Sequence, residues 1–431
     1  MIPQSKWPAR LDFGHAPETI GFWKRLVSEA LLLSGSTPLY LFSALPIADC
    51  LAGLDSALVA AGFSPETANS PLKISFQHWL SFKTQPVAPL LRWWRGLNRP
   101  VEVVSEFELR AALAAGFPPA MILVNGPAKH RWLAQFQLPE LSVNFDSLAE
   151  LDDLLPCALR LNWRMGLRIL TGEEFDPENP QFPTQFGLAP EAAMVGLKKL
   201  LGARARIEMV SFHLRTNIAA ASVFDRAITE VAEICRAAGF CPQVLDIGGG
   251  LPVRSVRSRG GKVYDGEFGL RSFAQSLRQS VKLFPGLREL WLENGRFLSS
   301  ASGVLVVKIL DVKERRGLRQ LICDGGRTLN ALMSVWEQHA LLPLPERSGE
   351  EALTVVHGPT CMAFDQLARL PLPRSLCAGD HLIWLDAGAY HLPWETRFSH
   401  GHAAVCWHDE RGLMLARAQQ SFEDFWGGWK Y

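Results

Sequence analysis

Between residues 80 and 293 the chain alternates short apolar runs with longer segments of helical periodicity, and this alternation limits the possible folds more than any other feature. In the longer segments apolar residues recur every three or four positions, which places one stripe against a sheet. Strands that alternate with helices favour a parallel sheet with crossover helices. Eight strands are expected: Leu80–Lys83, Val101–Val104, Ile122–Val124, Leu141–Asn144, Ala158–Asn162, Ile207–His213, Val244–Ile247 and Leu290–Glu293.

Eight such units within about 250 residues predict a closed, TIM-like (β/α)8 barrel, although an open doubly wound sheet would show the same alternation. After residue 300 the helical pattern stops, and short β-rich runs between glycine, proline and charged turns predict a β-domain. The strand-like run 37–43 could pair with it. We therefore expect three parts: an N-terminal segment (1–45) that packs with the β-domain, the barrel (46–302) and the C-terminal β-domain (303–431).

Composition and charge restrict the functions that this chain can have. Lys and Arg total 44 and Asp and Glu 43, so the net charge of +1 gives no general reason to expect a nucleic-acid or anionic-membrane partner. No run approaches the roughly 18 apolar residues of a membrane span, and the N-terminus, MIPQSKWPARLDFG, lacks the apolar core of a signal peptide. The eight dispersed cysteines form no CxxC pair and indicate reduced thiols. We expect a cytoplasmic protein that acts on a small molecule.

Two unusual segments follow the seventh and eighth expected strands, at the end of a barrel where ligands bind. In LDIGGGLP, Gly248, Gly249 and Gly250 would let the backbone approach an anion closely. In ENGRF, Glu293 and Arg296 follow the last strand, and an arginine beside a glycine loop suits a phosphate. A glycine cluster alone is usually only a turn, whereas two such features at adjacent strand ends indicate a phosphate site.

Lys83 ends the first expected strand in the apolar context WLSFKTQP. Burial there would lower the pKa of its amine, as covalent chemistry on an aldehyde requires. The alternative is a surface lysine at the start of a helix. An aldehyde cofactor that carries a phosphate would use Lys83, the glycine loop and Arg296 together, with a carboxylate facing its ring nitrogen.

The chain resembles the fold-type III pyridoxal-phosphate decarboxylases, the group of ornithine and diaminopimelate decarboxylases, and more distantly alanine racemase. The resemblance rests on collinear motifs through most of the chain: TPLY, SFKTQP, VEVVSEFEL, LVNGPAKH, VNFDSLAEL, LRLN, FGL, SFHL, LDIGGGLP, ENGRFL, DGG, HGPTC and GDHLIWLDAGAY. Such a set in one order is far more specific than any single motif. It implies the cofactor pyridoxal 5′-phosphate and a barrel with a β-domain.

The resemblance also implies which residues bind the cofactor. Lys83 would form a Schiff base with its aldehyde, His213 would stack on the pyridine ring, and Glu293 would pair with the ring nitrogen. The other residues include a phosphate clamp, a threonine in place of a phosphate-binding serine, a polar residue behind the cofactor and a structural arginine. They are Gly248, Gly249, Gly250, Gly295, Arg296, Tyr390, Thr216, Glu102 and Arg160.

The implied reaction is decarboxylation in a homodimer with shared active sites, catalysed by Lys83, His213 and Cys361. Cys361 in HGPTC matches a cysteine that crosses the dimer interface and reprotonates the product. Glu293 would keep the ring nitrogen protonated and so strengthen the electron sink, whereas alanine racemase has an arginine at that place. Two alternatives stay open, a racemase or other Cα enzyme on the same fold and a non-catalytic regulatory homologue.

Departures from the family pattern bear on the substrate. Met362 replaces an acidic residue that recognises a distal amine, so we expect a substrate other than a simple diamino acid such as ornithine, lysine or diaminopimelate. Such a substrate could be free or bound to a carrier. Arg215 replaces a glycine and could bind a carboxylate or phosphate, or point into solvent. Trp336 and Glu337 lie in the region from which the family draws substrate contacts.

One histidine-rich run is a candidate metal site. His400, His402, Cys406 and His408 stand at even positions, so on one strand they would share a face and could bind zinc. The proposed chemistry needs no metal, and we expect none. The alternative is a histidine-bearing strand near the dimer interface.

Overall fold

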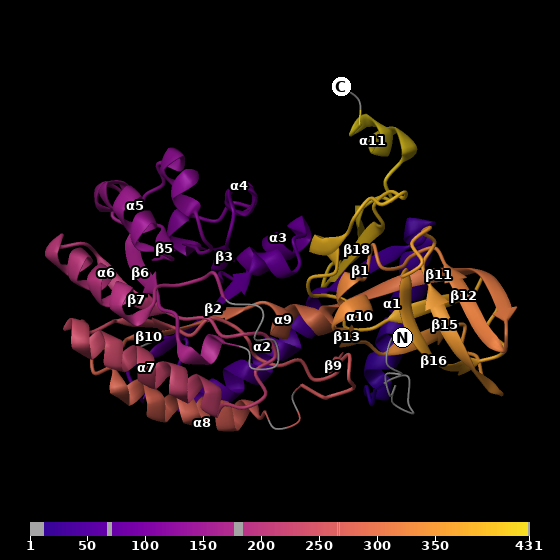
Figure 1. Cartoon of the computed structure of the whole chain (residues 1–431), viewed down its shortest axis with the longest axis horizontal. Helices are drawn as coiled ribbons and strands as arrows, with labels where there is room; N and C mark the ends of the chain where they lie inside the picture. The colour runs from indigo at the N-terminus through magenta and orange to yellow at the C-terminus, as the bar shows by residue number, and fades with distance from the viewer. Residues whose placement is uncertain (1–12, 67–70, 176–183, 265, 267, 430–431) are drawn as a thin grey trace.

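The structure is a computed structural model that describes residues 13–66, 71–175, 184–264, 266 and 268–429. Eight parallel strands close into a barrel in the order β10-β2-β3-β4-β5-β6-β7-β8, which confirms the predicted (β/α)8 barrel and excludes the open sheet (Figure 1). The barrel strands are β2 (Ser75–Ser81), β3 (Val101–Val103), β4 (Ile122–Val124), β5 (Ser142–Phe145), β6 (Arg164–Arg168), β7 (Ile207–Ser211), β8 (Val244–Asp246) and β10 (Glu289–Asn294).

The barrel helices bury one apolar stripe each against the strands, as α7 does with Phe224, Ile228 and Val231. Serine side chains cap the first turns of α2, α4 and α5 and accept a backbone N–H there. The helices are α2 (Ala44–Ala60), α3 (Ala88–Gly96), α4 (Glu106–Ala114), α5 (Leu148–Arg160), α6 (Pro190–Gly202), α7 (Ser222–Ala238), α8 (Leu270–Ser280) and the short α9 (Arg296–Ser299).

One of the eight predicted strands was wrong. The segment 158–162 continues α5 and the turn after it, and the strand follows as β6. Pro156 lies inside α5 without ending it, so the apolar stripe of Leu151, Leu154 and Ala158 belongs to a single helix.

The second part is a β-domain whose main sheet has the order β16-β15-β12-β11-β1-β18-β19, with β14 and β17 joined to it (Figure 1). The N-terminal run forms β1, which pairs with β11 and β18 as predicted. The strands are β1 (Leu39–Ser43), β11 (Gly303–Arg315), β12 (Leu318–Cys323), β14 (Leu341–Leu344), β15 (Glu351–His357), β16 (Gln366–Pro373), β17 (His381–Trp384), β18 (Ala404–Asp409) and β19 (Gly412–Arg417).

Three further helices belong to the β-domain part of the molecule. Helix α1 (Pro17–Ser34) packs Trp23 and Val27 against the sheet residues Leu41 and Cys406. Helix α10 (Ala331–Val335) is short, and α11 (Phe422–Gly427) projects away from the β-domain at the top of Figure 1.

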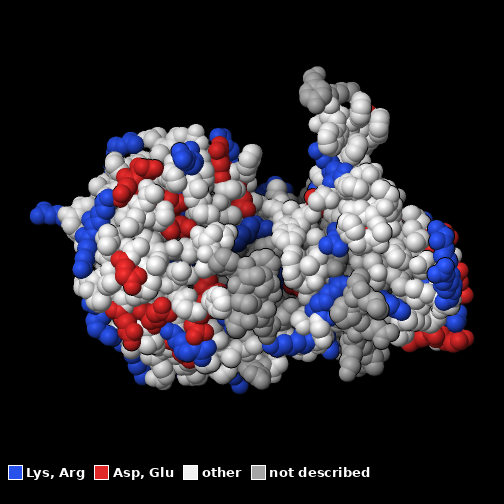
Figure 2. Space-filling model, viewed as in Figure 1, with Lys and Arg blue, Asp and Glu red and all other residues white. Residues whose placement is uncertain are grey.

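A small two-stranded sheet connects the parts. β9 (Arg257–Ser258), in the loop after the seventh barrel strand, pairs with β13 (Glu337–Gln338) of the β-domain. Acidic and basic side chains intermix over the face in Figure 2. None of the helices in the described residues has the length and apolar character needed to cross a membrane. Most of the N-terminal run judged for a signal peptide, residues 1–12, lies outside the described residues.

Candidate active site

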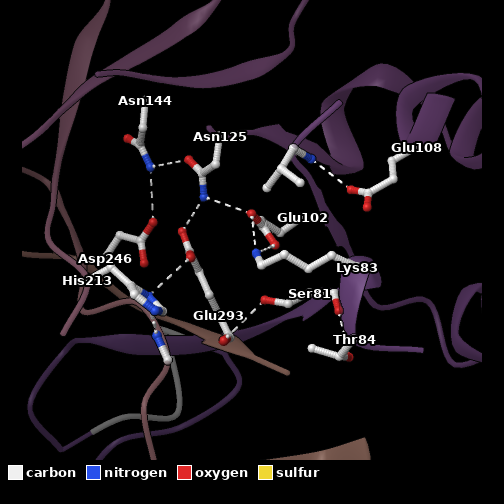
Figure 3. Close-up of polar contacts among 12 residues, drawn as sticks. Ser81, Lys83, Thr84, Glu102, Glu108, Asn125, Asn144, His213, Asp246 and Glu293 are labelled. Atoms are coloured by element: carbon white, nitrogen blue, oxygen red, sulfur yellow. Dashed lines mark hydrogen bonds and ion pairs between the residues drawn. The ribbon is translucent and has the colours of Figure 1, made fainter. Parts of the chain in front are cut away.

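Lys83 lies at the C-terminal end of β2, in a 3₁₀ turn (Phe82–Thr84). Its Nζ donates to both carboxylate oxygens of Glu102, at 2.8 and 3.0 Å (Figure 3). Glu102, on β3, is buried, whereas about a third of the Lys83 side chain is exposed, so the amine stands at an opening. The expected lowering of the Lys83 pKa is wrong here. Burial alone would lower this pKa, but the Glu102 carboxylate, followed by Tyr390 and Glu293, raises it above its ordinary value.

A chain of amide and carboxyl groups lies behind this amine (Figure 3). Asn125 donates through Nδ2 to Glu102 Oε1 at 3.3 Å and to Glu293 Oε1. Asn144 donates to Asn125 Oδ1 and to Asp246 Oδ2, both at 3.1 Å. Burial raises the pKa of Glu293 well above its ordinary value, and the charges of Asp246 and Glu102 raise it further. Glu293 therefore binds a proton more readily than an ordinary glutamate, which suits a group that would share a proton with a basic ring nitrogen.

Asp246 makes the stability of this cluster depend on pH. Burial, the largest cause, raises the pKa of its carboxyl to about 6. A carboxyl whose pKa is higher in the folded than in the unfolded chain stabilises the fold at low pH. This contribution, at most about 3 kcal/mol, is lost as pH rises through about 6. Relative to wild type, Asp246→Asn should therefore gain stability between about pH 4 and pH 7. Urea unfolding without added cofactor measures this change.

Asp409→Asn is the control for this pH series. Arg411, the largest cause, lowers the pKa of Asp409 to about 2, so the stability that it contributes is lost only as pH falls below about 4. Its difference from wild type should stay constant over the same range. Parallel curves for wild type and Asp246→Asn would contradict the prediction.

His213 follows β7, and its ring meets the glycine loop after β8. Its Nδ1 accepts the N–H of Gly249 at 3.1 Å and lies 3.9 Å from Glu293 Oε2. Burial, followed by the charges of Arg168 and Lys83, lowers the pKa of His213 to about 3. The ring is therefore neutral with its proton on Nε2, and a neutral ring can stack on a pyridine without charge repulsion.

The three glycines let the loop after β8 approach neighbouring backbone. A Cβ at Gly249 would lie 2.6 Å from the carbonyl oxygen of Glu293, and one at Gly250 would lie 2.7 Å from that of Arg215. Gly248 and Gly250 also have positive φ angles of 63° and 93°. A side chain at any of these positions would push the loop away from the site.

Gly295 has a packing role beside Lys83. A Cβ there would lie 2.5 Å from Thr84 Cγ2 and 3.1 Å from Ser81 Cβ, in the turn that carries the lysine. We predict that Gly295→Ala displaces this turn and costs about 1–3 kcal/mol of stability. It should also weaken pyridoxal phosphate binding in an absorbance titration. Gly202→Ala, with no atom within 4 Å of the added carbon, is the control. Unchanged binding and stability in Gly295→Ala would show that the turn has room.

Arg296 begins α9 and lies against the β-domain. One guanidinium nitrogen, Nη1, donates to Glu337 Oε1 at 2.6 Å, and the group sits 4.9 Å from the centre of the Tyr390 ring. Burial alone would raise the pKa of Glu337, but Arg296 and His339 lower it to about 2, so this carboxylate is ionised. The backbone N–H of Tyr390 donates to the Thr84 carbonyl at 2.8 Å and ties this loop to the Lys83 turn.

The arrangement fits pyridoxal phosphate. Arg296 Nε is buried and has no hydrogen-bond partner among the described residues, so its N–H can donate to an anionic oxygen. The glycine loop and Arg296 follow adjacent strands, β8 and β10. The partly exposed Lys83 and the buried Glu293 stand at the same end of the barrel, where the amine can react with an aldehyde and the carboxyl group can pair with a ring nitrogen.

The prediction that Arg160 lies near the site is wrong. Arg160 is exposed at the end of α5, where its Nη2 lies 3.8 Å from Cys157 Sγ, because the predicted strand there is part of that helix. Arg168 stands at the end of β6 instead and donates to Glu174 Oε1 at 2.8 Å. The positive charge of Arg168 helps to lower the pKa of His213. The sequence signal for Arg168 was the run GLRIL, which places an arginine between apolar residues as the run LRLN does around Arg160.

Two further predicted residues flank the glycine loop. Arg215 donates through Nη1 to the carbonyl oxygens of Glu173 and Phe175, at 2.9 and 3.3 Å, which holds it against the loop after β6. Thr216 follows it and is exposed, with its side chain open to a ligand.

The candidate site residues of the β-domain lie in different places, some near Arg296 and some in an exposed turn. Glu337 is buried beside Arg296, whereas Trp336 is half-exposed and packs edge-on against Trp394. Cys361 and Met362 lie in the turn between β15 and β16, where Cys361 is exposed. Among the described residues Cys361 makes no hydrogen bond or ion pair with the cluster around Lys83, which contains Glu102 and Glu293. This chain alone therefore does not bring Cys361 and Lys83 together.

The histidine-rich run considered for zinc does not converge. His400 and His402 precede β18, and Cys406 and His408 lie on it. Cys406 is packed in the apolar core, and His408 Nδ1 lies 3.0 Å from Ser43 Oγ. Within the described ranges these four side chains form no common metal site.

Comparison with known proteins agrees with this geometry. Residues 73–300 match the family model of the pyridoxal-dependent decarboxylases for their pyridoxal binding domain. The diaminopimelate decarboxylase of Deinococcus radiodurans is 28% identical over 398 residues, which are 90% of this chain and 95% of that protein. That of Zymomonas mobilis is 24% identical over 79% of this chain and 83% of its own length.

Solved structures share the fold. The diaminopimelate decarboxylase from Helicobacter pylori, in complex with L-lysine, superposes with a TM-score of 0.78 at 22% identity, covering 93% of this chain and 98% of that one. The lysine/ornithine decarboxylase from Vibrio vulnificus, with cadaverine, gives 0.71 at 22% identity, covering 89% and 96%. Since the family model spans more than half of the sequence and the barrel and β-domain match, the chain belongs to the fold-type III pyridoxal-phosphate-dependent decarboxylases.

Proposed function

We propose that this protein decarboxylates an α-amino acid with pyridoxal phosphate bonded covalently to Lys83. The observation that carries the proposal is the pairing of two groups at one end of the barrel. The Lys83 amine lies 2.8 Å from Glu102, and Asn125 donates to both Glu102 and Glu293. An amine and a ring-nitrogen partner this close, beside an anion clamp, suit one phosphorylated aldehyde.

Each residue would have a distinct task. The cofactor, when bound, supplies an electron sink for the carbanion that loss of CO2 leaves. Glu293 would pair with the ring nitrogen and share a proton with it, and neutral His213 would pack on the ring. Arg296 and the glycine loop would hold the phosphate. Glu102 accepts a hydrogen bond from the Lys83 amine and orients it.

Cys361 would supply the final proton from a second copy of the chain. Its exposed thiol, without a contact to its own Lys83 cluster, supports a homodimer in which each β-domain completes the neighbouring site. Delivery from one direction would protonate one face of the product.

The substrate side chain has two opposing arguments. The relatives are named as diaminopimelate and lysine/ornithine decarboxylases, which favours a diamino acid and speaks against the expectation drawn from Met362. Diamino acids are therefore the first substrates to test. The family assignment likewise gives no support to the racemase and regulatory alternatives.

The test is CO2 release by the protein reconstituted with pyridoxal phosphate. The panel contains meso-diaminopimelate, L-lysine and L-ornithine beside free and carrier-linked amino acids without a distal amine. We expect release from a diamino acid, which would show that the inference from Met362 was wrong. Release only from the other group would overturn the assignment by the relatives' names. Deuterium exchange at Cα with no CO2 from any substrate would overturn decarboxylation itself.

A further inference from the structure

Three side chains with metal-binding atoms meet behind the phosphate clamp. Glu337 is on β13, His339 follows that strand, and His391 lies directly after Tyr390. Their exposed fractions are 4%, 1% and 1%. One ligand atom from each lies within 4.8 Å of the others, and no other such group occurs in the described part of the chain. The reaction proposed above uses neither histidine.

A neutral His339 ring cannot satisfy both of its polar contacts without an additional cation. Its Nδ1 lies 2.8 Å from the carbonyl oxygen of Leu385, and its Nε2 lies 3.1 Å from Glu337 Oε2. Both partners can only accept, whereas a neutral imidazole has a single N–H. With Nδ1 donating to Leu385, Nε2 presents a lone pair to an ionised carboxylate. A positive charge between Nε2 and Oε2, either a second proton or a metal ion, is required.

His391 distinguishes between these two cations. Both of its ring nitrogens are buried and lack a hydrogen-bond partner in the described part of the chain. Burying such a group without a hydrogen-bond partner destabilises the fold. A second proton on His339 would leave His391 unsatisfied, because the ring centres are 5.0 Å apart in an edge-to-face contact. A metal ion in the cluster would bind one nitrogen of His391 and would also supply the positive charge between His339 and Glu337.

We propose that Glu337, His339 and His391 bind a divalent transition-metal ion, with zinc as the ion that the ligand set favours. Two ligands at about 2.0–2.1 Å from a tetrahedral ion lie about 3.3 Å apart, close to the observed 3.1 Å between Nε2 and Oε2. Leu385 fixes the orientation of His339, and Arg296 binds the other oxygen of Glu337, as groups around metal ligands commonly do.

The ion would position the phosphate clamp rather than take part in the reaction. It joins β13 to the loop that carries Tyr390, whose backbone N–H is bonded to the Lys83 turn. It also fixes Glu337 and therefore Arg296. Removal of the metal should then weaken the binding of pyridoxal phosphate, a consequence that rests on the proposed function. Metal binding itself does not.

The first experiment measures metal in the intact holoenzyme by mass spectrometry. Wild type from zinc-supplemented cells should hold about one ion per chain, and His339→Gln and His391→Gln should lose it. His130→Gln is the matched control, since its Nδ1 is also buried without a hydrogen-bond partner and it lies away from the cluster, in the barrel. Metal-free wild type, or full occupancy in both variants, would overturn the proposal.

A second experiment avoids variants that could misfold. Wild type stripped with a chelator is titrated with Co²⁺, whose visible bands report nitrogen and oxygen ligands. We expect saturation at about one equivalent and competition by Zn²⁺. A featureless titration would mean that His339 carries a second proton instead. Both experiments are read without turnover, so failure of the proposed decarboxylation would leave their result intact.

Discussion

Replacing Lys83 with alanine should remove the absorbance of the bound cofactor near the visible edge and lower CO2 release by on the order of a thousandfold or more. The Lys83 amine donates to Glu102 at the end of the barrel that also holds Glu293 and the glycine loop. A truncated side chain leaves the phosphate clamp in place, so pyridoxal phosphate could still bind but without a covalent bond. Absorbance spectra and CO2 release, measured on the same sample, separate the two effects.

Lys313→Ala provides the control for this substitution. Lys313 is a partly exposed residue of β11 in the β-domain, and its loss should leave both measurements unchanged. A Lys83→Ala protein that kept the absorbance band, or a wild type without one, would refute the assignment of Lys83 as the cofactor lysine.

The order of strands and helices could be predicted because short apolar runs, such as Ile122–Val124, alternate with segments of helical periodicity. The exceptions lie where polar residues are paired inside the barrel wall. β2 begins at Ser75, earlier than predicted, because its first half contains His78. That ring is buried and bonded to Asp55 and to Asn294, which are distant in sequence. A local pattern cannot show such a pairing.

The site shows the same division. Lys83, Glu293 and the glycine loop stand in motifs, and each motif marks a strand end. Asn125 and Asn144 also stand in motifs, LVNGPAKH and VNFDSLAEL, but neither motif indicates a partner for its amide. Asn125 follows β4 and Asn144 lies on β5, and only closure of the barrel places them between Glu102, Glu293 and Asp246. Arg168 was missed because the fifth strand was predicted at residues 158–162, where α5 ends, so that Arg160 was named in its place. These residues required the three-dimensional arrangement.

Cys361→Ala should lower decarboxylation by about 10²–10⁴-fold with little change in the cofactor spectrum, since a positioned general acid contributes that much. Its side chain touches no residue of its own Lys83 cluster, so cofactor binding does not depend on it. Loss of the absorbance band in Cys361→Ala would place the cysteine in the cofactor site and contradict this role.

Mixing two inactive variants tests whether Cys361 acts across a dimer. If Lys83→Ala and Cys361→Ala subunits exchange, half of the dimers contain one of each, and one site in each mixed dimer has an intact Lys83 and an intact Cys361. About a quarter of the wild-type activity should return. Lys83→Ala mixed with His213→Ala should stay inactive, because both residues belong to one barrel and neither mixed site is complete. No recovery in the first mixture would mean that Cys361 serves its own chain, and the exposed turn between β15 and β16 would then have to move toward the barrel.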